Sequence, residues 1–560
     1  MSQCNQGVSN PTPPPPVENP AKKPVTFRFS IFFDGTGNNR DNIRARKEFE
    51  SGAGSKGAAF YERLKRQHTE RDADKYESFN GDYSNVAIME EDFNTSTTAD
   101  RSFSIYIEGA GTQHFKDVQE EFDKVLSDYQ ERIDALAPKE GYTTKQSRLR
   151  ARARKNLQRE QYNAKAAHDS IPGGAFAIGV TGIEAKSRAA FNKISKVFKN
   201  KKKFSRGEEK VAKLELDVFG FSRGAATARY FAHQVLKGQR TEEHIGSMYG
   251  GYGHNVYAVH FYTLKQQLEQ AGVEVAENAV TLNFVGLYDT VSSHRIALTS
   301  DVKSLGLRTV KEAKDRVVHL ASAEEHRMCF SLSTIKAAIN AGVGEEYYLP
   351  GVHSDIGGGY RDYDERAATG NEEMILASRS PVWRGMLQLT GYNKTGPRQM
   401  HALIEQMHKE IDAEGWYASG ELTIRSEAGG LWDEKLYAKR KGIRNGYRLI
   451  AYEFMVEKSK KYKLEFFPKF TTRVSATEKD EQLRLWKNNL RSKSLGKGNS
   501  GSKVSDWMYK TSDKTLNDLR KETLHCSARV FDIDQWGEKS ATGFWPRIYK
   551  GRRFRKSYDG

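Results

Sequence analysis

The stretch from Leu214 to Gly238 constrains the fold of this chain more than any other. Over 214–218 apolar residues alternate with acidic ones, which is the period of a β-strand. From Ala225 to Leu236 the apolar residues recur with a helical period, and Gly238 is the expected end of that helix. Between the two stands Gly220-Phe221-Ser222-Arg223-Gly224, a G-x-S-x-G sequence. A strand, a tight turn and a helix are therefore predicted in succession.

This context predicts that Ser222 is a nucleophile. The turn holds the serine in a strained backbone conformation, so the residues two positions away must lack a Cβ, and Gly220 and Gly224 supply that clearance. The hydroxyl then stands above the sheet edge, at a helix N-terminus that can stabilise an oxyanion. The alternative is a glycine-bounded turn whose serine is only structural.

Composition limits the classes of protein to be considered. The chain has 560 residues, enough for two to four domains, and 37% of them are hydrophobic. We find no run of 18 apolar residues and, in the first residues, no basic and apolar pattern of a cleavable export signal. The three cysteines are too few and too scattered for a disulfide framework or a zinc site: Cys4, Cys329 and Cys526. They fit synthesis in a reducing compartment.

The charge balance is basic, with 89 Lys and Arg against 72 Asp and Glu and a net charge of +17. A basic surface can meet nucleic acid, anionic lipid or an acidic partner. The sequence has no zinc finger, basic zipper or aromatic RNA-binding strand, so nucleic acid is not an expected partner.

Four regions follow from the pattern along the chain. Residues 1–24 are proline-rich, which predicts a disordered tail. Residues 25–380 are predicted to alternate strands with helices. Within that region, residues 115–170 are predicted to form a charged helical insertion. Residues 381–560 are aromatic and basic, and we expect them to form an accessory region that packs on the core. The predicted core strands are Val25–Phe33, Phe103–Ile107, 214–218, Val280–Leu287 and Tyr347–Leu349, and the main helical stretches are 58–67, 173–198, 225–236, 257–270 and 310–340. The fold class is therefore α/β, with a mainly parallel sheet.

A serine becomes a good nucleophile only when a histidine accepts its proton and a carboxylate orients that histidine. In α/β-hydrolases the chain order is serine, acid, histidine. Asp289 and His353 follow Ser222 in that order, each in a loop after a predicted strand. Asp289 as a helix N-cap and His353 as a structural histidine are the alternatives. Asp355 is the rival acid, although its place two residues from His353 suits loop shaping.

An oxyanion hole is expected from the backbone N–H of Arg223 and from the loop at Gly35 and Thr36. Asp34 is expected to support that loop. A cation held by Asp34 with Asp289 or Asp355 is the alternative, but more carboxylates would be needed. We expect neither a metal nor a cofactor.

Six blocks occur in one order and point to a family. They are F-F-D-G-T-G-N-N (32–39), Y-I-E-G-A-G-T (106–112), F-G-F-S-R-G-A-A (219–226), V-G-L-Y-D-T-V (285–291), A-S-A-E-E-H-R (321–327) and L-P-G-V-H-S-D-I-G-G-G-Y (349–360). Together they resemble the α/β-hydrolase domain of the type VI secretion lipase effectors of the Tle-one-like family. The resemblance covers roughly 25–365, with a weaker echo at L-H-C-S-A-R (524–529). The chain departs from the family in its 115–170 insertion and in Glu108, where the family more often has an aliphatic residue.

This resemblance implies an antibacterial phospholipase A in which Ser222, Asp289 and His353 are nucleophile, acid and base. It further implies a glycerophospholipid substrate cut at an acyl ester, with the first position favoured over the second. The implied partners are a VgrG-type spike protein and a cognate immunity lipoprotein. The enzyme would be made in the cytoplasm without a signal peptide, secreted by the type VI system and active in the periplasm of a target cell.

Two other functions are compatible with the residues. The same triad would serve a thioesterase or a peptidase. The chain could also be a basic, aromatic-rich binding protein with a structural elbow. Basic residues at 199–203 and the aromatic C-terminal region are candidate elements for docking on anionic lipid.

Overall fold

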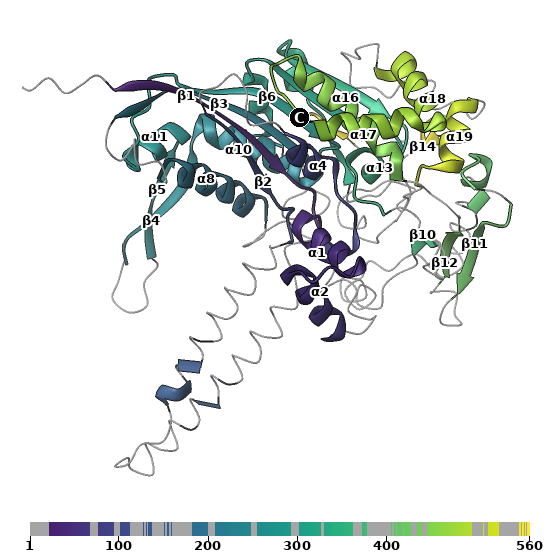
Figure 1. Ribbon diagram of the computed structural model, residues 1–560, viewed down its shortest axis with the longest axis horizontal. Coiled ribbons are helices and arrows are strands. Elements are labelled where there is room, and N and C mark those ends of the chain that lie inside the picture. Colours follow the sequence, from purple (N-terminus) through teal and green to yellow (C-terminus); the bar gives the residue numbers. More distant parts are fainter. Residues whose placement is uncertain are drawn as a thin grey trace, which may run out of the picture.

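A six-stranded sheet forms the centre of the molecule, and every neighbouring pair of its strands is parallel (Figure 1). In spatial order the strands are β2 (Arg101–Ile107), β1 (Lys23–Phe33), β3 (Glu209–Phe221), β6 (Val280–Tyr288), β7 (Arg316–Ser322) and β9 (Gly344–Leu349). This is the mainly parallel α/β fold that the sequence predicts.

The structure is a computed structural model. It describes residues 22–67, 77–93, 101–112, 182–199, 208–247, 255–292, 302–325, 330–361, 372–377, 411–417, 419–426, 434–439, 445–466, 468–495, 513–525, 548–549, 552–553 and 557–560, with a few residues between these ranges, among them 133–136 and Arg555. Most of the 115–170 insertion, the tail up to residue 21 and the basic residues 200–203 lie outside the described part.

Helices cover both faces of the sheet, and each face has its own apolar cluster. On one face β1 contributes Phe27, Phe29 and Ile31, which pack with α8 (Ile183–Lys199), α10 (Arg223–Lys237) and α11 (Leu264–Gln270). The other face packs against α4 (Asn85–Asp92) and the C-terminal helices. Figure 1 shows α8 and α10 on one side of the sheet and α16 on the other. Burial on both faces explains why the core strands are so apolar.

The C-terminal helices share the core of the sheet. They are α16 (Arg448–Lys460), α17 (Pro468–Lys479), α18 (Glu481–Leu490) and α19 (Lys514–Glu522). Met455 and Trp486 belong to the same apolar cluster as Phe219 and Phe284. Arg28 of β1 forms a buried ion pair with Asp217 of β3 (Nε–Oδ2 2.7 Å) and also donates to the carbonyl oxygen of Tyr462, just after α16. The boundary near residue 380 remains a prediction.

Smaller elements surround this core. Helices α1 (Arg40–Glu50), α2 (Lys56–Gln67) and α3 (Glu77–Asn80) follow β1, and α12 (Lys336–Asn340) and α13 (His353–Gly357) flank β9. Two antiparallel pairs are β4 (Gln239–Ser247) with β5 (Asn255–Tyr262) and β13 (Ile548–Tyr549) with β14 (Arg552–Arg553). A three-stranded antiparallel sheet has β12 (Glu434–Lys439) between β10 (Glu372–Ala377) and β11 (Leu422–Ser426). Strand β15 (Ser557–Tyr558) pairs in parallel with β8 (Leu332–Ser333).

Two of the predicted helical stretches are partly wrong. Within 310–340 the 3₁₀ helix Leu307–Glu312 and α12 are helical, but the middle is the core strand β7. Its sequence R-V-V-H-L-A-S has apolar residues on both faces, Val317 and Ala321 on one and Val318 and Leu320 on the other, because both faces are buried. It therefore lacks the alternation that marks a half-buried strand. Within 257–270 only α11 is helical, since the first part continues strand β5.

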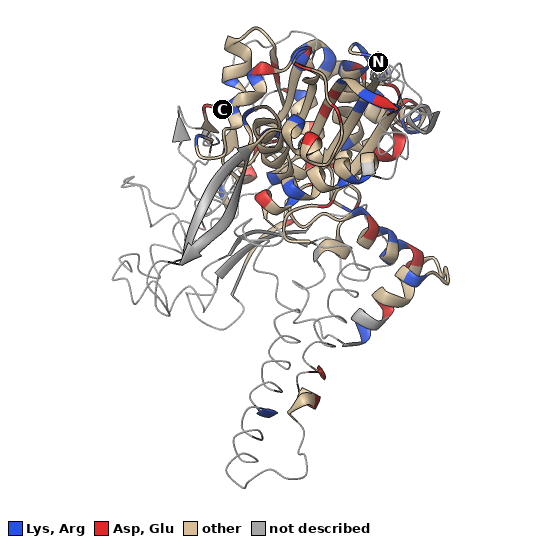
Figure 2. Cartoon of the chain, turned by 90° about the vertical axis from the view of Figure 1, so that its left-hand side faces the viewer, with Lys and Arg blue, Asp and Glu red and all other residues tan. Residues whose placement is uncertain are grey.

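Charged residues of both signs are interspersed along the described ribbon (Figure 2). Within that part of the chain no helix has the length and apolar character needed to cross a membrane.

Three loops at the carboxyl end of the sheet pack against one another backbone to backbone. A Cβ at Gly109, after β2, would overlap the carbonyl oxygen of Gly35 in the loop after β1. A Cβ at Gly224, at the start of α10, would overlap the carbonyl oxygens of Phe33 and Asp34. The absence of side chains at these glycines is therefore what brings the three loops together.

Gly109→Ala should consequently destabilise the fold. Its methyl group meets backbone rather than a flexible side chain, so relief requires moving whole loops, at a cost of about 3 kcal/mol in the free energy of unfolding. Gly54→Ala is the matched control, because a Cβ there meets no atom within 4 Å. Denaturant unfolding of the two variants checks this, and equal stability would contradict the backbone packing described here.

Candidate active site

Ser222 occupies the sharp turn between β3 and α10. Its backbone has φ 59° and ψ −129°, a region that non-glycine residues avoid and that costs on the order of 1–3 kcal/mol. The turn is held by hydrogen bonds, since the Ser222 N–H donates to the carbonyl oxygen of Tyr288 (3.0 Å) and its carbonyl accepts from the Val291 N–H (3.3 Å). Its side chain forms no capping bond to α10. The strained turn thus places Ser222 at the carboxyl end of the central strand β3.

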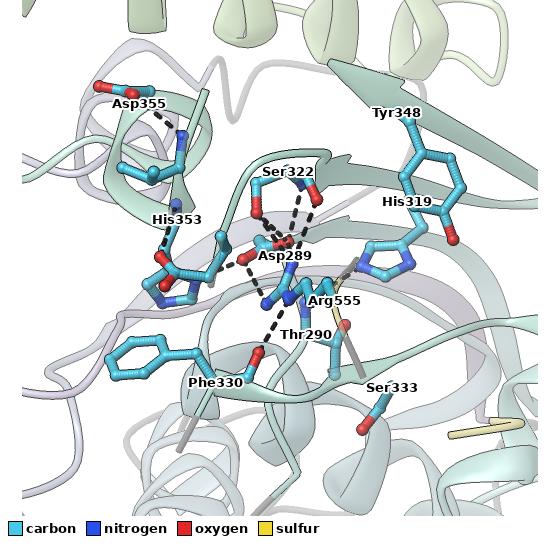
Figure 3. A network of polar contacts seen from close by, with 12 residues as sticks. Asp289, Thr290, His319, Ser322, Phe330, Ser333, Tyr348, His353, Asp355 and Arg555 are labelled. Carbon is cyan, nitrogen blue, oxygen red and sulfur yellow. Dashed lines mark hydrogen bonds and ion pairs between the residues drawn. The ribbon is translucent and has the colours of Figure 1, made fainter. Parts of the chain in front are cut away.

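Asp289 follows Tyr288 directly after β6, in the segment that holds the Ser222 turn. Its carboxylate accepts a hydrogen bond from His353. The distance from His353 Nδ1 to Asp289 Oδ2 is 2.5 Å, and both residues are buried (Figure 3). An ionised carboxylate can only accept, so Nδ1 carries the proton and Nε2 is the nitrogen left for chemistry. Asp289 also has a positive φ of 43°, which is uncommon outside glycine.

Further donors converge on the same carboxylate. Asp289 Oδ1 accepts from the backbone N–H (2.8 Å) and the hydroxyl (3.1 Å) of Ser322, at the end of β7. Arg555 binds it through both oxygens. Burial alone would raise the pKa of the Asp289 carboxyl, but the charge of Arg555 and the hydrogen bond from His353 hold that pKa well below its usual range. Asp289 is therefore ionised at neutral pH.

Aromatic rings and a glutamate fix the position of His353. The ring of Phe221 lies 4.6 Å from the imidazole, centroid to centroid, and the ring of Phe330 meets it edge-on at 4.8 Å. The His353 N–H donates to Glu325 Oε2 at 3.2 Å. A Cβ at Gly357 would overlap the Phe221 ring, so the last residue of α13 packs directly against the residue that precedes Ser222.

Asp355 bonds a different histidine. Its carboxylate accepts from His525 Nδ1 (2.7 Å) and from the backbone N–H groups of His525 and Val352 (3.0 Å each). The His525 ring in turn stacks on Tyr360 at 3.8 Å. Asp355 thus shapes its own loop and ties it to the segment that carries His525, whereas Asp289 is the acid that contacts His353.

The loop after β1 is organised by Asp34. This carboxylate accepts from the Gly35 N–H (2.7 Å) and from the Tyr106 hydroxyl (2.6 Å). Burial raises the pKa of Asp34, although these hydrogen bonds oppose the shift. The Gly35 N–H expected in the oxyanion hole is thereby already engaged. Thr36 follows it, and its side-chain oxygen is buried without a hydrogen-bond partner within the described part of the chain.

Glu108, the departure from the family pattern, is bonded to α8. Its carboxylate accepts from Lys186 Nζ at 2.7 Å, and the same ammonium donates to the Thr112 carbonyl at 2.7 Å. Each acidic side chain singled out from the sequence is thus held by a donor of its own. The described residues contain no group of three or more His, Cys, Asp and Glu side chains that could hold a metal ion.

A second buried histidine supports the acid loop from behind. The Thr290 N–H donates to His319 Nε2 (3.1 Å), so His319 Nδ1 carries the proton that it donates to Glu346 Oε2 (2.9 Å). Glu346 also accepts from Tyr348 and from the backbone of Ile335. His319 thus holds Thr290, the residue that follows Asp289 (Figure 3).

Ser222, Asp289 and His353 all lie at the carboxyl end of the sheet: Asp289 bonds His353, and Ser222 is tied through its backbone to the residues on either side of Asp289. Arg223 is at the first position of α10, and Gly35 and Thr36 are in the loop after β1. Sequence reasoning missed Ser322, Glu325 and Arg555. The first two lie in the A-S-A-E-E-H-R block, whose order in the chain was a usable signal. Arg555 has no such signal, because it is 266 residues from its partner.

Comparison with known proteins supplies the family. A family model described as the catalytic domain of Tle1-like type VI secretion system phospholipase effectors matches residues 28–380. Among solved structures, the chain is similar to the Tle1 effector bound to the VgrG spike, with 20% identity, a TM-score of 0.47 and coverage of 91% of this chain and 85% of that one. An uncharacterised protein from Pseudomonas aeruginosa is also similar, with 19% identity, a TM-score of 0.28 and coverage of 60% and 42%.

A comparison with curated proteins gave no match. The two structural likenesses are distant, and the assignment rests on the family model, which covers more than half of the chain. With the resemblance of the six sequence blocks, that match leads to one conclusion: the chain belongs to the family of Tle1-like type VI secretion phospholipase effectors.

Proposed function

We propose that this protein is a serine phospholipase A that cleaves acyl esters of membrane glycerophospholipids, with the first position favoured over the second. The observation that carries the proposal is the buried 2.5 Å hydrogen bond between Asp289 and His353, on the loop that also holds the Ser222 turn. In this proposal Ser222 is the nucleophile, His353 the general base and Asp289 the acid that orients it.

In the acylation step Ser222 Oγ attacks the ester carbonyl while His353 Nε2 takes the hydroxyl proton. The tetrahedral intermediate collapses, and the imidazolium returns that proton to the departing glycerol oxygen, which leaves as a lysophospholipid. Water then repeats the sequence on the acyl-enzyme and releases a fatty acid. The ionised Asp289 stabilises the imidazolium in both halves.

The oxyanion is assigned to the backbone N–H groups of Arg223 and Thr36. Arg223 begins α10, so its N–H is at the positive end of the helix dipole. The Gly35 N–H donates to Asp34 in the resting structure, which makes Thr36 the better partner. Asp34 and Asp355 are proposed as supports of their loops.

Ser222→Ala should lower kcat by about ten-thousandfold or more, down to the rate left by binding and the oxyanion hole. Asp289→Asn should cost about as much as in other triads, on the order of ten-thousandfold, because the amide favours the wrong imidazole tautomer. Asp355→Asn should cost much less activity and lower mainly stability. Ester hydrolysis by folded, purified variants ranks them, and a greater loss at Asp355 than at Asp289 would reverse the assignment of the acid.

The substrate class rests on the family, and the basic net charge suits it. A protein that docks on a bilayer from solution is drawn to anionic headgroups, each basic residue near the surface contributing about 1 kcal/mol. Lys199, which ends α8, begins the basic stretch 199–203, and 200–203 lie outside the described residues. The described aromatic residues of the C-terminal region include Trp416, which is buried against Arg520.

Mass spectrometry of products from phospholipids that carry different chains at the two positions should show a fatty acid from the first position and the matching lysophospholipid. Ser222→Ala is the control.

Rates on anionic vesicles should exceed those on zwitterionic vesicles and should fall as the salt concentration rises. Lipid hydrolysis without fatty acid release, or activity confined to soluble short esters, would rule out phospholipase A; salt-independent rates would rule out only electrostatic docking.

Delivery follows from the same family. We propose that a type VI machine exports this enzyme on a VgrG-type spike and that it acts in the periplasm of a target cell. Expression in the cytoplasm should be harmless, since a producing cell must survive its own synthesis, whereas export with an added signal peptide should be toxic. Viable counts test this, with Ser222→Ala as control. A cognate immunity lipoprotein should suppress the toxicity, and equal toxicity from both compartments would contradict the proposal.

A further inference from the structure

Arg555 grips the carboxylate that bonds His353. Its Nη1 lies 2.5 Å from Asp289 Oδ1 and its Nη2 lies 2.9 Å from Oδ2, so the guanidinium meets both oxygens in a fork. The side chain of Arg555 is 7% exposed and that of Asp289 is fully buried. A buried, bidentate ion pair between arginine and a carboxylate has a fixed geometry, because the planar guanidinium must align with both oxygens.

The segment that carries Arg555 is docked on elements beside the site. Strand β15 pairs with β8, and the Thr334 N–H donates to the carbonyl oxygen of Tyr558 (3.0 Å). The Ala337 N–H, in α12, donates to the Gly560 carbonyl (2.8 Å), and Lys336 forms an exposed ion pair with Asp559 (2.7 Å). Backbone pairing therefore determines where the guanidinium lies.

Arg555 also reaches the surroundings of His353. Its Nε donates to the carbonyl oxygen of Phe330 (2.8 Å), whose ring packs edge-on against the imidazole. Its Nη1 donates to the Ser322 hydroxyl (2.8 Å), which itself bonds Asp289. The Arg555 guanidinium thus contacts the Asp289 carboxylate, the Ser322 hydroxyl and the backbone of Phe330, whose ring packs against His353 (Figure 3).

Charge matters as well as geometry. Charged groups beside the Asp289–His353 pair include Arg555, on the carboxylate, and Glu325, which accepts from the backbone N–H of His353. Tyr348 is a titratable neighbour, and burial together with the charges of Glu346 and Asp289 raises its pKa. Asp355 of the same helix is bonded to His525, and His319 of β7 is bonded to Glu346. Arg555 is thus a cation in direct contact with the pair. A positive charge there opposes proton uptake by either member.

We propose that Arg555 is a positioning residue of the hydrolytic reaction: it orients the Asp289 carboxylate toward His353 and keeps this pair free of a second proton in mildly acidic solution. This inference rests on the proposed roles of Asp289 and His353. Because the two groups titrate as a coupled pair, removal of the neighbouring cation favours protonation whichever of them takes the proton.

Arg555→Met should therefore move the acid limb of the kcat/KM profile toward higher pH by about one unit. It should also lower kcat, because the carboxylate loses its fork. Arg555→Lys keeps the charge but cannot meet both oxygens in one plane, so its acid limb should stay near that of the parent while kcat falls about tenfold. The two variants thus separate charge from orientation.

The assay is hydrolysis of p-nitrophenyl butyrate from about pH 5 to about pH 9, a range that spans histidine titration. Thermal unfolding verifies that each variant is folded. The matched control is Lys336→Met, which removes an ion pair of the same docked segment without touching the pair Asp289–His353. It should leave the acid limb and kcat unchanged.

A folded Arg555→Met with the parental acid limb would overturn the proposal, and so would an equal shift in Lys336→Met, which would assign the effect to docking of the segment. If Arg555→Met does not fold, Arg555→Lys decides, because an unchanged kcat contradicts the orienting role. Ser222→Ala in the same series separates the two hypotheses. Activity retained in Ser222→Ala defeats the proposed function, whereas an inactive Ser222→Ala beside a parental Arg555→Met defeats only the role of Arg555.

Discussion

The buried carboxylate of Asp289 is the contact on which the candidate site depends. Burying an ionised carboxylate costs free energy unless hydrogen-bond donors or cations surround it. The donors to Asp289 come from three separate parts of the chain. Ser322 ends β7, His353 begins α13 and Arg555 precedes β15. The need to satisfy one carboxylate therefore couples the central sheet, the histidine loop and a distant segment into a single arrangement.

Close backbone packing is the second constraint, and it explains the glycines of the motifs. Gly109 and Gly224 let the loops after β2 and β3 meet the loop after β1. Gly357 lets the histidine helix lie on the ring of Phe221. A chemical site built from loops needs them held within fractions of an ångström, and contacts between backbones are stiffer than contacts between flexible side chains.

The acid was the point on which local sequence reasoning was weakest. Asp289 and Asp355 are the same residue type, and the sequence favoured Asp289 only through chain order and its place after a predicted strand. The separation comes from a second histidine, because His525 bonds Asp355 and leaves Asp289 as the carboxylate on His353.

The α/β class, the strand–turn–helix around Ser222 and the order of the three candidate residues could all be predicted from the sequence, because they depend on local periodicity and on glycines at fixed spacing. Strand β7 was wrongly predicted to be helical, because both of its faces are buried and it lacks the alternation that marks a half-buried strand. Two contacts could be identified only in the folded chain: the hydrogen bond from His353 to Asp289 and the ion pair of Arg555 with the same carboxylate. Pairing across 266 residues leaves no periodic trace in a single sequence, since it is set by how β15 docks beside the sheet.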